Sequence, residues 1–334
     1  MQLNIDIKTY KHDNKLNIFS IIISRHVYVY SGRGYTMIKG VFTPIITIFD
    51  ENGDFDQKSN RQMIEKLISD GIYGICILGT TGEFFNMTFD EKKKYIEFAS
   101  RTINRRVKLI VGTGSPNIRE AIALAKCAEK NNADAVLVVP PFYFKLDEEH
   151  IFEYFSIIAE NTNLPMILYN IPQNTKIELS VELVLKLANK YENIAHGGIK
   201  DTTPALGNVR RFVEKVKSIY PDFAVLSGID EYLIPNLMIG GNGIIGTQTN
   251  TQAKLLVETY KTFLKGDFKK LLELQKKINH IMDVREMPNS NNILSTKTAA
   301  SIALNSDFNT SIRYYDIKVT DDVKNQIKKI VNAK

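Results

Sequence analysis

Short, continuous runs of apolar residues alternate with amphipathic segments from Val41 onward. The apolar runs lack the strict alternation of a half-exposed strand, and this is typical of parallel strands that are covered on both faces. Eight such runs are predicted as strands, at 41–49, 71–79, 107–112, 133–140, 165–171, 194–200, 223–228 and 243–248.

The segments between these runs carry helix start and stop signals. Thr88 followed by Glu91 three residues later forms a capping box, which predicts a helix start. Further helices are expected to begin at Ser115 and Asp147, and one is expected to end at Gly71.

Eight strand–helix units in series predict an α/β fold that closes into a (β/α)8 TIM barrel, which we place at residues 37–269. The alternative is an open, doubly wound sheet. That fold would be favoured by a Gly-x-Gly-x-x-Gly turn after the first strand, and the sequence at 43–46 has no such pattern. Residues 270–334 are predicted as additional C-terminal helices, with an apolar set of Leu271, Leu272, Leu274, Ile278 and Ile281, packed on the barrel or on a neighbouring subunit.

Residues 1–36 precede this regular pattern and allow three interpretations. They contain β-rich runs at 18–23 and 27–30, so they can be an extra strand or a disordered leader. A signal peptide fits poorly, because its basic, apolar and cleavage regions do not line up. We favour a natural start at Met37, which would make residues 1–36 a non-native extension.

Composition narrows the class of protein. Hydrophobic residues make up 44% and charged residues 24%, the balance of a globular protein. The net charge of +6 is scattered rather than concentrated, so we expect no binding to nucleic acid or membranes. Cys76 and Cys127 are too few for a disulfide framework and indicate a reducing, cytoplasmic location. The five histidines show no metal-ligand spacing, so no metal is expected.

The polar residues with chemical potential gather where the predicted strands end. This is where a barrel of this type carries its active site. The strand-end segments are 79–83, 140–143, 169–172, 198–202, 227–231 and 246–250.

Lys200, at the end of an apolar strand, is the most informative single residue. Burial disfavours the charged form of a lysine, and the neutral amine can attack a carbonyl to form an imine. For an isolated lysine, the alternative is an ion-paired side chain, with Asp201 as its partner. Tyr169, at the end of the neighbouring strand, can move a proton to or from a substrate bound there, or can be an ordinary core tyrosine.

The turn Gly79-Thr80-Thr81-Gly82 offers backbone N–H groups and two hydroxyls near a helix start, which suits a carboxylate. Taken alone, it can also be an ordinary glycine-rich turn. Its combination with Lys200 and Tyr169 favours an active site.

Three strand-end motifs together resemble the family of class I aldolases that contains dihydrodipicolinate synthase, N-acetylneuraminate lyase and 2-keto-3-deoxygluconate aldolase. The motifs are Gly-Thr-Thr-Gly-Glu at 79–83, Tyr-Asn-Ile-Pro at 169–172 and Gly-Ile-Lys-Asp-Thr at 198–202. The resemblance extends over about residues 38–330. It is specific because three motifs on three strands must coincide.

The resemblance implies that Lys200 forms an imine with a pyruvate-type substrate and that Tyr169 is the proton shuttle. Thr81 and Tyr143 would complete a hydroxyl relay. Thr80, together with Thr81, would hold the substrate carboxylate. No separate cofactor is implied, because the imine on Lys200 is the electron sink.

Two further implications concern the surroundings of the imine. The backbone carbonyl of Ile245 would border the same pocket, and Thr202 is counted with the substrate-binding residues. In the family, the tyrosine matching Tyr143 often completes the site of a neighbouring subunit, which implies a homo-oligomer, with a tetramer favoured.

The second substrate is suggested by departures from the synthase pattern. Asn174 stands where synthases usually carry an arginine that binds a carboxylate, although Lys176 could partly replace it. Gly228, Asp230 and Glu231 resemble the sugar-binding segment of the lyase, although the two acidic residues can equally cap the next helix.

We therefore expect an aldolase that cleaves a 2-keto-3-deoxy sugar acid, with 2-keto-3-deoxygluconate favoured, to pyruvate and an aldehyde. The alternatives are 4-hydroxy-tetrahydrodipicolinate synthase, N-acetylneuraminate lyase and a 2-keto-3-deoxy sugar acid dehydratase. A non-catalytic barrel that binds sugar acids is the rival from a different class.

Overall fold

The computed structural model describes residues 7–9, 18–23, 26–31, 35–287 and 291–332. The chain divides into two compact units, Met1–Met37 and Ile38–Lys334.

The first unit is a three-stranded antiparallel sheet with the order β1-β2-β3. Its strands are β1 (Ile7–Thr9), β2 (Ile18–Ile23) and β3 (His26–Ser31), and Ile21 pairs with Tyr28. Strands β2 and β3 cover the two β-rich runs that were noted in the sequence. The natural start at Met37 stays a prediction.

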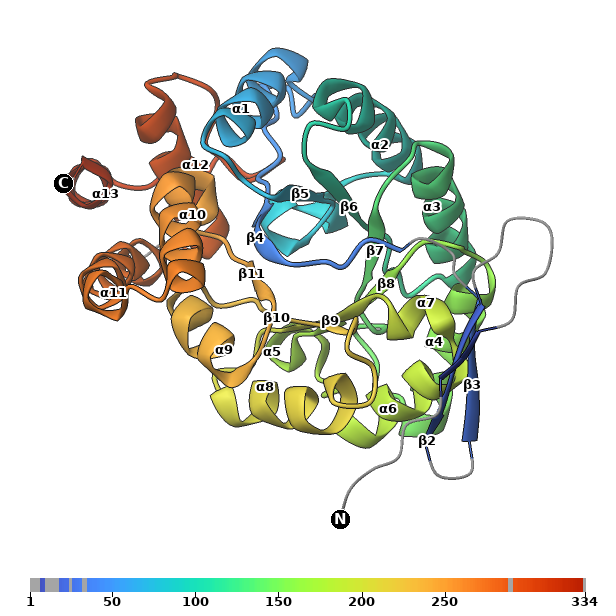
Figure 1. Cartoon of the computed structure of the whole chain (residues 1–334). Coiled ribbons are helices and arrows are strands. Elements are labelled where there is room, and N and C mark those ends of the chain that lie inside the picture. The colour runs from blue at the N-terminus through green and yellow to red at the C-terminus, as the bar shows by residue number, and fades with distance from the viewer. Residues whose placement is uncertain (1–6, 10–17, 24–25, 32–34, 288–290, 333–334) are drawn as a thin grey trace. The chain divides into compact units, whose positions relative to one another are not determined.

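The second unit is a closed parallel barrel with the strand order β10-β11-β4-β5-β6-β7-β8-β9, and this confirms the predicted TIM barrel. The alternative of an open, doubly wound sheet is therefore wrong. Figure 1 looks into the barrel, with helices arranged around it. The strands are β4 (Gly40–Pro44), β5 (Gly74–Ile77), β6 (Lys108–Gly112), β7 (Ala135–Val138), β8 (Met166–Asn170), β9 (Gly198–Asp201), β10 (Ala224–Ser227) and β11 (Gly243–Ile245).

In most strands, successive residues face two different hydrophobic layers, so both faces of these runs are apolar. In β5, Cys76 packs inside the barrel with Phe42, Ile110 and Leu226, whereas Ile75 packs in the outer layer. Outward-facing strand residues meet the inward stripes of the helices. This two-sided burial explains why the apolar runs are continuous.

The helices between the strands follow most of the predicted signals. Thr88 and Glu91 form the expected capping box, and Asp147 caps its helix as predicted. The helix predicted at Ser115 begins later, because the side chain of Asn117 provides the cap. The covering helices are α1 (Gln57–Ser69), α2 (Phe89–Ile103), α3 (Ile118–Lys130), α4 (Glu148–Glu160), α6 (Val181–Lys190), α8 (Leu206–Phe212), α9 (Leu233–Ile239) and α10 (Thr249–Lys265).

Short helical turns occupy several of the connections at the strand ends. They are η1 (Thr80–Gly82), η2 (Phe84–Asn86), α5 (Pro172–Thr175), α7 (Glu192–Ala195), η3 (Val213–Lys217) and η4 (Asp230–Tyr232). Three of them, η1, α5 and η4, follow strands whose ends were predicted to carry the active site.

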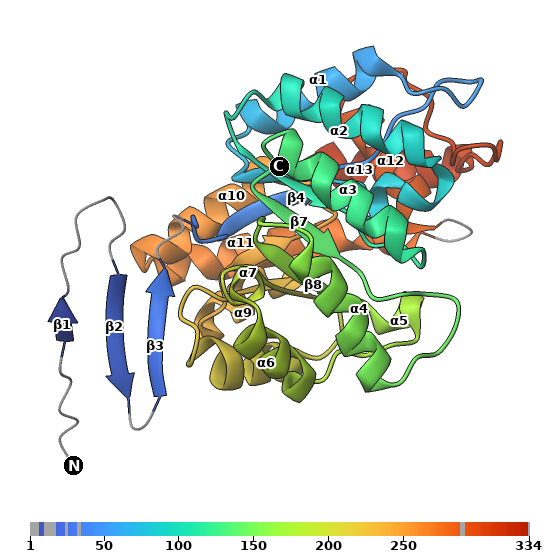
Figure 2. The same cartoon turned by 90° about the vertical axis from the view of Figure 1, so that its right-hand side faces the viewer.

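The chain ends in helices α11 (Phe268–Met282), α12 (Asn292–Leu304) and α13 (Asp321–Asn332), with the turn η5 (Asp283–Glu286) between the first two. Helix α11 packs on α10 and η4, and α12 packs on α10 and η1. Both views show α11 beside α10 (Figures 1 and 2). Four of the five predicted apolar positions are buried, but the prediction for Leu272 is wrong, since its side chain is 70% exposed.

Candidate active site

Lys200 and Tyr169 lie side by side on adjacent strands at the carboxyl end of the barrel. They are register partners in β9 and β8, and each residue is only 5% exposed. The Lys200 Nζ atom lies 4.2 Å from the centre of the Tyr169 ring. The amine is therefore buried against the residue that was predicted as its proton-transfer partner.

Asp201 is not the ion-pair partner that the alternative interpretation of Lys200 requires. Neighbouring residues of a strand point to opposite faces, and the Asp201 carboxylate faces away from Lys200. Its Oδ1 accepts a hydrogen bond from Asn170 Nδ2 at 2.7 Å, and its Oδ2 accepts one from Thr203 Oγ1 at 2.7 Å. Burial raises the pKa of Asp201 to about 6, although these hydrogen bonds lower it.

The predicted carboxylate-binding turn follows β5, four strands away from β9 around the barrel. Thr80 and Thr81 form the 3-10 turn η1 with Gly82. Because all the barrel strands are parallel, this turn lies at the same end of the barrel as Lys200. Thr81 is buried, and its Oγ1 lies 3.5 Å from Thr247 Oγ1.

The sequence analysis did not predict a role for Thr247, although the residue lies in the strand-end segment 246–250. Its contact with Thr81 joins the loop after β11 to the turn after β5. Ile245 is the last residue of β11 and is fully buried next to this loop.

Gly228 leaves space beside Lys200. A Cβ atom at this position would lie 3.0 Å from Lys200 Cε and 2.1 Å from Thr202 Oγ1. The Thr202 hydroxyl is buried and has no hydrogen-bond partner among the described residues. A side chain at position 228 would therefore close the space around the amine.

Asp230 is buried inside the protein and does not lie on an open surface. It is fully buried, and its Oδ2 accepts a hydrogen bond from the Gln248 backbone N–H at 3.2 Å. Burial raises the pKa of Asp230 to about 6, whereas the charges of Arg285 and Lys200 lower it. Asp230 Oδ1 and both side-chain polar atoms of the buried Gln248 have no hydrogen-bond partners among the described residues.

Glu231 and Asn174 lie nearer the surface. Glu231 is half-buried, and its carbonyl oxygen accepts a hydrogen bond from Gln275 of α11 at 3.1 Å. Asn174 is exposed in the short helix α5. Lys176, the proposed substitute for the missing arginine, is also exposed, and its Nζ donates to the Gln173 carbonyl at 3.0 Å.

Tyr143 is not brought to Lys200 within one chain. Its side chain is completely exposed, and its backbone has a φ of 85°, a left-handed conformation that is unfavourable for an aromatic residue. The neighbouring Phe142 packs edge-on against Phe84, with ring centres 5.9 Å apart.

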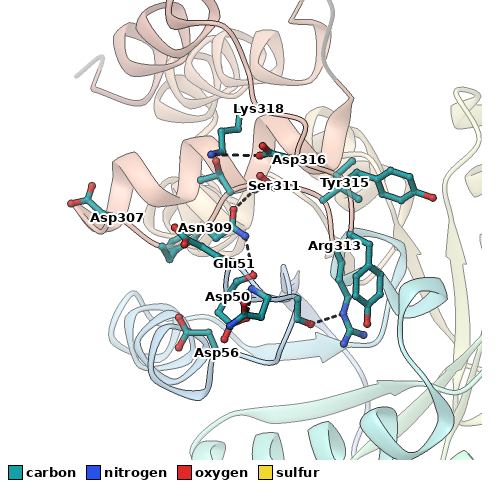
Figure 3. A pocket seen from close by; sticks show the side chains of 16 residues that line it. Asp50, Glu51, Asp56, Asp307, Asn309, Ser311, Arg313, Tyr315, Asp316 and Lys318 are labelled. Carbon is teal, nitrogen blue, oxygen red and sulfur yellow. Dashed lines mark hydrogen bonds and ion pairs between the residues drawn. The ribbon is translucent and has the colours of Figure 1, made fainter.

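A cavity of about 780 Å³ lies elsewhere, between the loop after β4 and the segment 307–318 (Figure 3). Asp50, Glu51, Asp307 and Arg313 are among its lining residues, and none of the predicted site residues is. In the part of the chain that the structure describes, no group of three or more His, Cys, Asp or Glu side chains is placed to hold a metal ion. Among the described residues, no helix is both long enough and apolar enough to cross a membrane.

Known proteins are similar to this chain in both sequence and fold. The model of the dihydrodipicolinate synthetase family matches residues 37–334. The probable 2-dehydro-3-deoxy-D-pentonate aldolase YjhH of Escherichia coli K12 is 35% identical over 239 residues, which are 72% of this chain and 79% of the relative. The 4-hydroxy-tetrahydrodipicolinate synthase of Bartonella bacilliformis is 38% identical over 242 residues, which are 72% of this chain and 81% of the relative.

Among solved structures, the chain is similar to YagE, a prophage protein from E. coli K12 in complex with pyruvate. The TM-score is 0.84 at 30% identity, and the match covers 89% of this chain and 98% of YagE. The match of sequence, fold and strand-end motifs shows that the chain belongs to the dihydrodipicolinate synthetase family.

Proposed function

We propose that the chain is a class I aldolase that cleaves a 2-keto-3-deoxy sugar acid to pyruvate and an aldehyde through an imine on Lys200. Membership of a family of aldolases and synthases makes it an enzyme of the lyase class. The observation that carries the proposed mechanism is the burial of Lys200 against Tyr169, with the amine 4.2 Å from the ring centre.

In the proposed reaction, the neutral Lys200 amine attacks the C2 ketone of the substrate, and water leaves to give a protonated imine. Tyr169 takes the proton of the C4 hydroxyl as its own hydroxyl proton passes to the Thr81–Tyr143 relay. The C3–C4 bond breaks, its electron pair moves into the imine, and the aldehyde leaves. The resulting enamine takes a proton at C3, and water hydrolyses the imine to release pyruvate and free Lys200.

The carboxylate of the substrate would bind at the Thr80–Thr81 turn, which carries backbone N–H groups and two hydroxyls. The carbonyl of Ile245 would border the pocket, and Thr202 and Gly228 would line the space beside the amine. Thr81 and Tyr143 would relay the proton of Tyr169. The mechanism requires no separate cofactor or metal ion.

The exposed Asn174 supports a second substrate portion without an additional carboxylate, because it replaces a residue that would pair with one. Asp230 and Glu231 would accept hydrogen bonds from sugar hydroxyls. The relative YagE, 36% identical over 234 residues, carries the provisional name 2-dehydro-3-deoxy-D-gluconate aldolase, which supports the same sugar acid here.

A synthase activity is the second candidate, because synthases of the family are as similar to this chain as the aldolases are. In that reaction, Lys176 would contact the carboxylate of an aspartate semialdehyde-type substrate. N-acetylneuraminate lyase, a sugar acid dehydratase and a non-catalytic sugar-acid-binding barrel remain alternatives, and the products formed from a panel of substrates distinguish them.

Tyr143 supports assembly of identical subunits, because a fully exposed tyrosine in a left-handed conformation would gain contacts at a neighbouring subunit. We propose a homotetramer with small-molecule substrates and no nucleic-acid or membrane partner. Free thiols at Cys76 and Cys127 support a cytoplasmic location.

A substrate panel tests the proposed activity. Pyruvate release would be measured from 2-keto-3-deoxygluconate, its 6-phosphate and N-acetylneuraminate, and the aldehyde or dehydrated product would be identified by mass. Condensation of pyruvate with aspartate semialdehyde would be measured in parallel. We expect 2-keto-3-deoxygluconate to give the highest kcat/KM, whereas condensation with aspartate semialdehyde alone would contradict the aldolase proposal.

A further inference from the structure

Glu83 directly follows the Thr80–Gly82 turn and lies in a conformation that its residue type disfavours. Its φ is 56° and its ψ is 37°, the left-handed region, and its N–H donates to the Thr80 carbonyl at 3.1 Å. The side chain is completely buried. A buried, charged residue in a left-handed conformation needs specific partners to hold it there.

Those partners come from the C-terminal segment, more than 200 positions later in the chain. The Glu83 carboxylate forms an ion pair with Lys297 of α12, whose side chain is also completely buried. Glu83 Oε2 also accepts hydrogen bonds from the Arg313 backbone N–H at 2.9 Å and from Asn86 Nδ2 at 3.1 Å.

Lys297 and Arg313 are themselves fixed in place. Lys297 Nζ donates to the Ser311 carbonyl at 3.0 Å. The Arg313 guanidinium donates to the Gly53 carbonyl and to the Asn86 carbonyl, each at 2.7 Å, and pairs with Glu91. Figure 3 shows Arg313 reaching from its own segment toward the loop after β4. The carboxylate of Glu83 therefore binds to a rigid set of groups.

The other side of the turn is also held away from its preferred backbone geometry. Leu78, just before Gly79, has a φ of 56°. Its carbonyl oxygen lies so close to Gly112 that a Cβ there would be 2.1 Å away. Two non-glycine residues in left-handed conformations thus flank the turn, and its shape depends on contacts made outside it.

We propose that Glu83 and Lys297 are positioning residues, through which the C-terminal segment holds the Thr80–Thr81 turn in the shape that binds the carboxylate of the keto acid. This inference rests on the proposed function, in which that turn binds the carboxylate of pyruvate. Removal of the ion pair leaves the Lys200 amine in place and lets the backbone at Glu83 relax. The affinity for pyruvate therefore falls, while the capacity to form the imine persists.

The test uses the full chain, pyruvate and borohydride, so it does not depend on the identity of the aldehyde. Borohydride reduces the imine to a stable adduct, which mass spectrometry measures at Lys200 as the pyruvate concentration is varied. For Lys297→Met, we expect the half-saturating pyruvate concentration to rise roughly tenfold, with the adduct at saturation unchanged. If Lys297→Met does not fold, the double variant Glu83→Gln/Lys297→Met, which buries no unpaired charge, carries the test with the same expectation.

Lys66→Met is the matched control. Lys66 also pairs with a buried carboxylate, that of Asp70, but this pair lies at the end of α1. Lys66→Met should lower the Tm and leave the half-saturating pyruvate concentration within about twofold of the wild-type value. Wild-type half-saturation in folded Lys297→Met or in the double variant would overturn the inference. Absence of an adduct in the wild-type chain would instead overturn the proposed function.

Discussion

Lys200 and Asp201 are neighbours in β9, and their side chains point to opposite faces of the strand. Lys200 points toward Tyr169, while Asp201 is held by Asn170 and Thr203. The sequence could predict the first contact, because adjacent strand ends carried both residues. It left Asp201 open as an ion-pair partner, because only the register decides which face each side chain takes.

Tyr169→Phe tests the proton transfer. Removing the hydroxyl leaves the ring against Lys200 but removes the proposed base. We expect kcat for the best substrate to fall about 100-fold, with KM within about threefold of wild type. Steady-state kinetics measures both values, and an unchanged kcat would exclude Tyr169 as the proton shuttle.

Asp230→Asn tests the effect of burial on a carboxyl group. The pKa of Asp230 is raised to about 6 from 3.8, so the folded chain holds this proton more tightly than the unfolded chain. This contribution to stability is fully present below about pH 4 and is lost as the pH rises through 6. As the pH rises from 4 to 8, the free energy of unfolding of Asp230→Asn should therefore increase by up to about 3 kcal/mol relative to that of wild type.

Urea unfolding at both pH values measures this difference. Exposed Asp307 provides the control, since Asp307→Asn removes a carboxyl group that is not buried. If the difference in the free energy of unfolding between Asp230→Asn and wild type did not depend on pH, the effect assigned to burial would be contradicted.

At the level of helices and strands, the apolar runs predicted every barrel strand but not its ends. Run 41–49 continues beyond Pro44, because residues after the strand remain buried at the barrel mouth. Run 194–200 begins inside the short helix α7, because Ile194 and Ala195 are buried in either conformation. Hydrophobic pattern reports burial, and strand ends depend on pairing with neighbours that are distant in sequence.

Helix starts were predicted correctly where one residue could serve as the cap. The prediction failed where two nearby polar residues could both serve as the cap. Thr88 and Asp147 cap the expected helices, whereas Ser115 Oγ accepts from the Asn117 N–H, and Asn117 becomes the cap. The bonds that join Glu83 to Lys297 and Arg313 had no signal in the sequence, because their partners meet only in the folded chain.

Thr88→Ala tests the capping box of α2. Thr88 Oγ1 accepts the Glu91 N–H at 3.3 Å, and Glu91 accepts the Thr88 N–H at 2.7 Å. Loss of the hydroxyl should lower the free energy of unfolding by about 1 kcal/mol. Thr88→Ser, which keeps the hydroxyl, should lose less than half of that amount, and equal losses in the two variants would argue against the cap.

At the scale of the whole molecule, one chain supplies Lys200, Tyr169 and the Thr80–Thr81 turn, and leaves Tyr143 in solvent. The sequence predicted the barrel and placed the polar strand-end residues at one end of it. Subunit contacts leave no periodic pattern in a sequence, so the role of Tyr143 at a neighbouring subunit rests on the family resemblance and stays a prediction.

Mixing an impaired variant with an inactive one tests whether Tyr143 acts across a subunit boundary. Tyr143→Ala should lower kcat about tenfold or more, and Lys200→Ala should abolish turnover. Mixed oligomers contain sites with both residues intact, so co-expressed variants should regain activity above the sum of the two parents. A monomer by light scattering, or no recovery in the mixture, would contradict an intersubunit role.

Trapping with borohydride in the presence of pyruvate, followed by peptide mapping, tests the imine mechanism itself. The mechanism predicts a single reduced pyruvyl adduct on the peptide that carries Lys200, and no adduct in Lys200→Ala. Lys297, which is also buried but lies in α12, serves as an internal control and should remain unmodified. An unmodified Lys200, or an adduct that persists in Lys200→Ala, would contradict the mechanism.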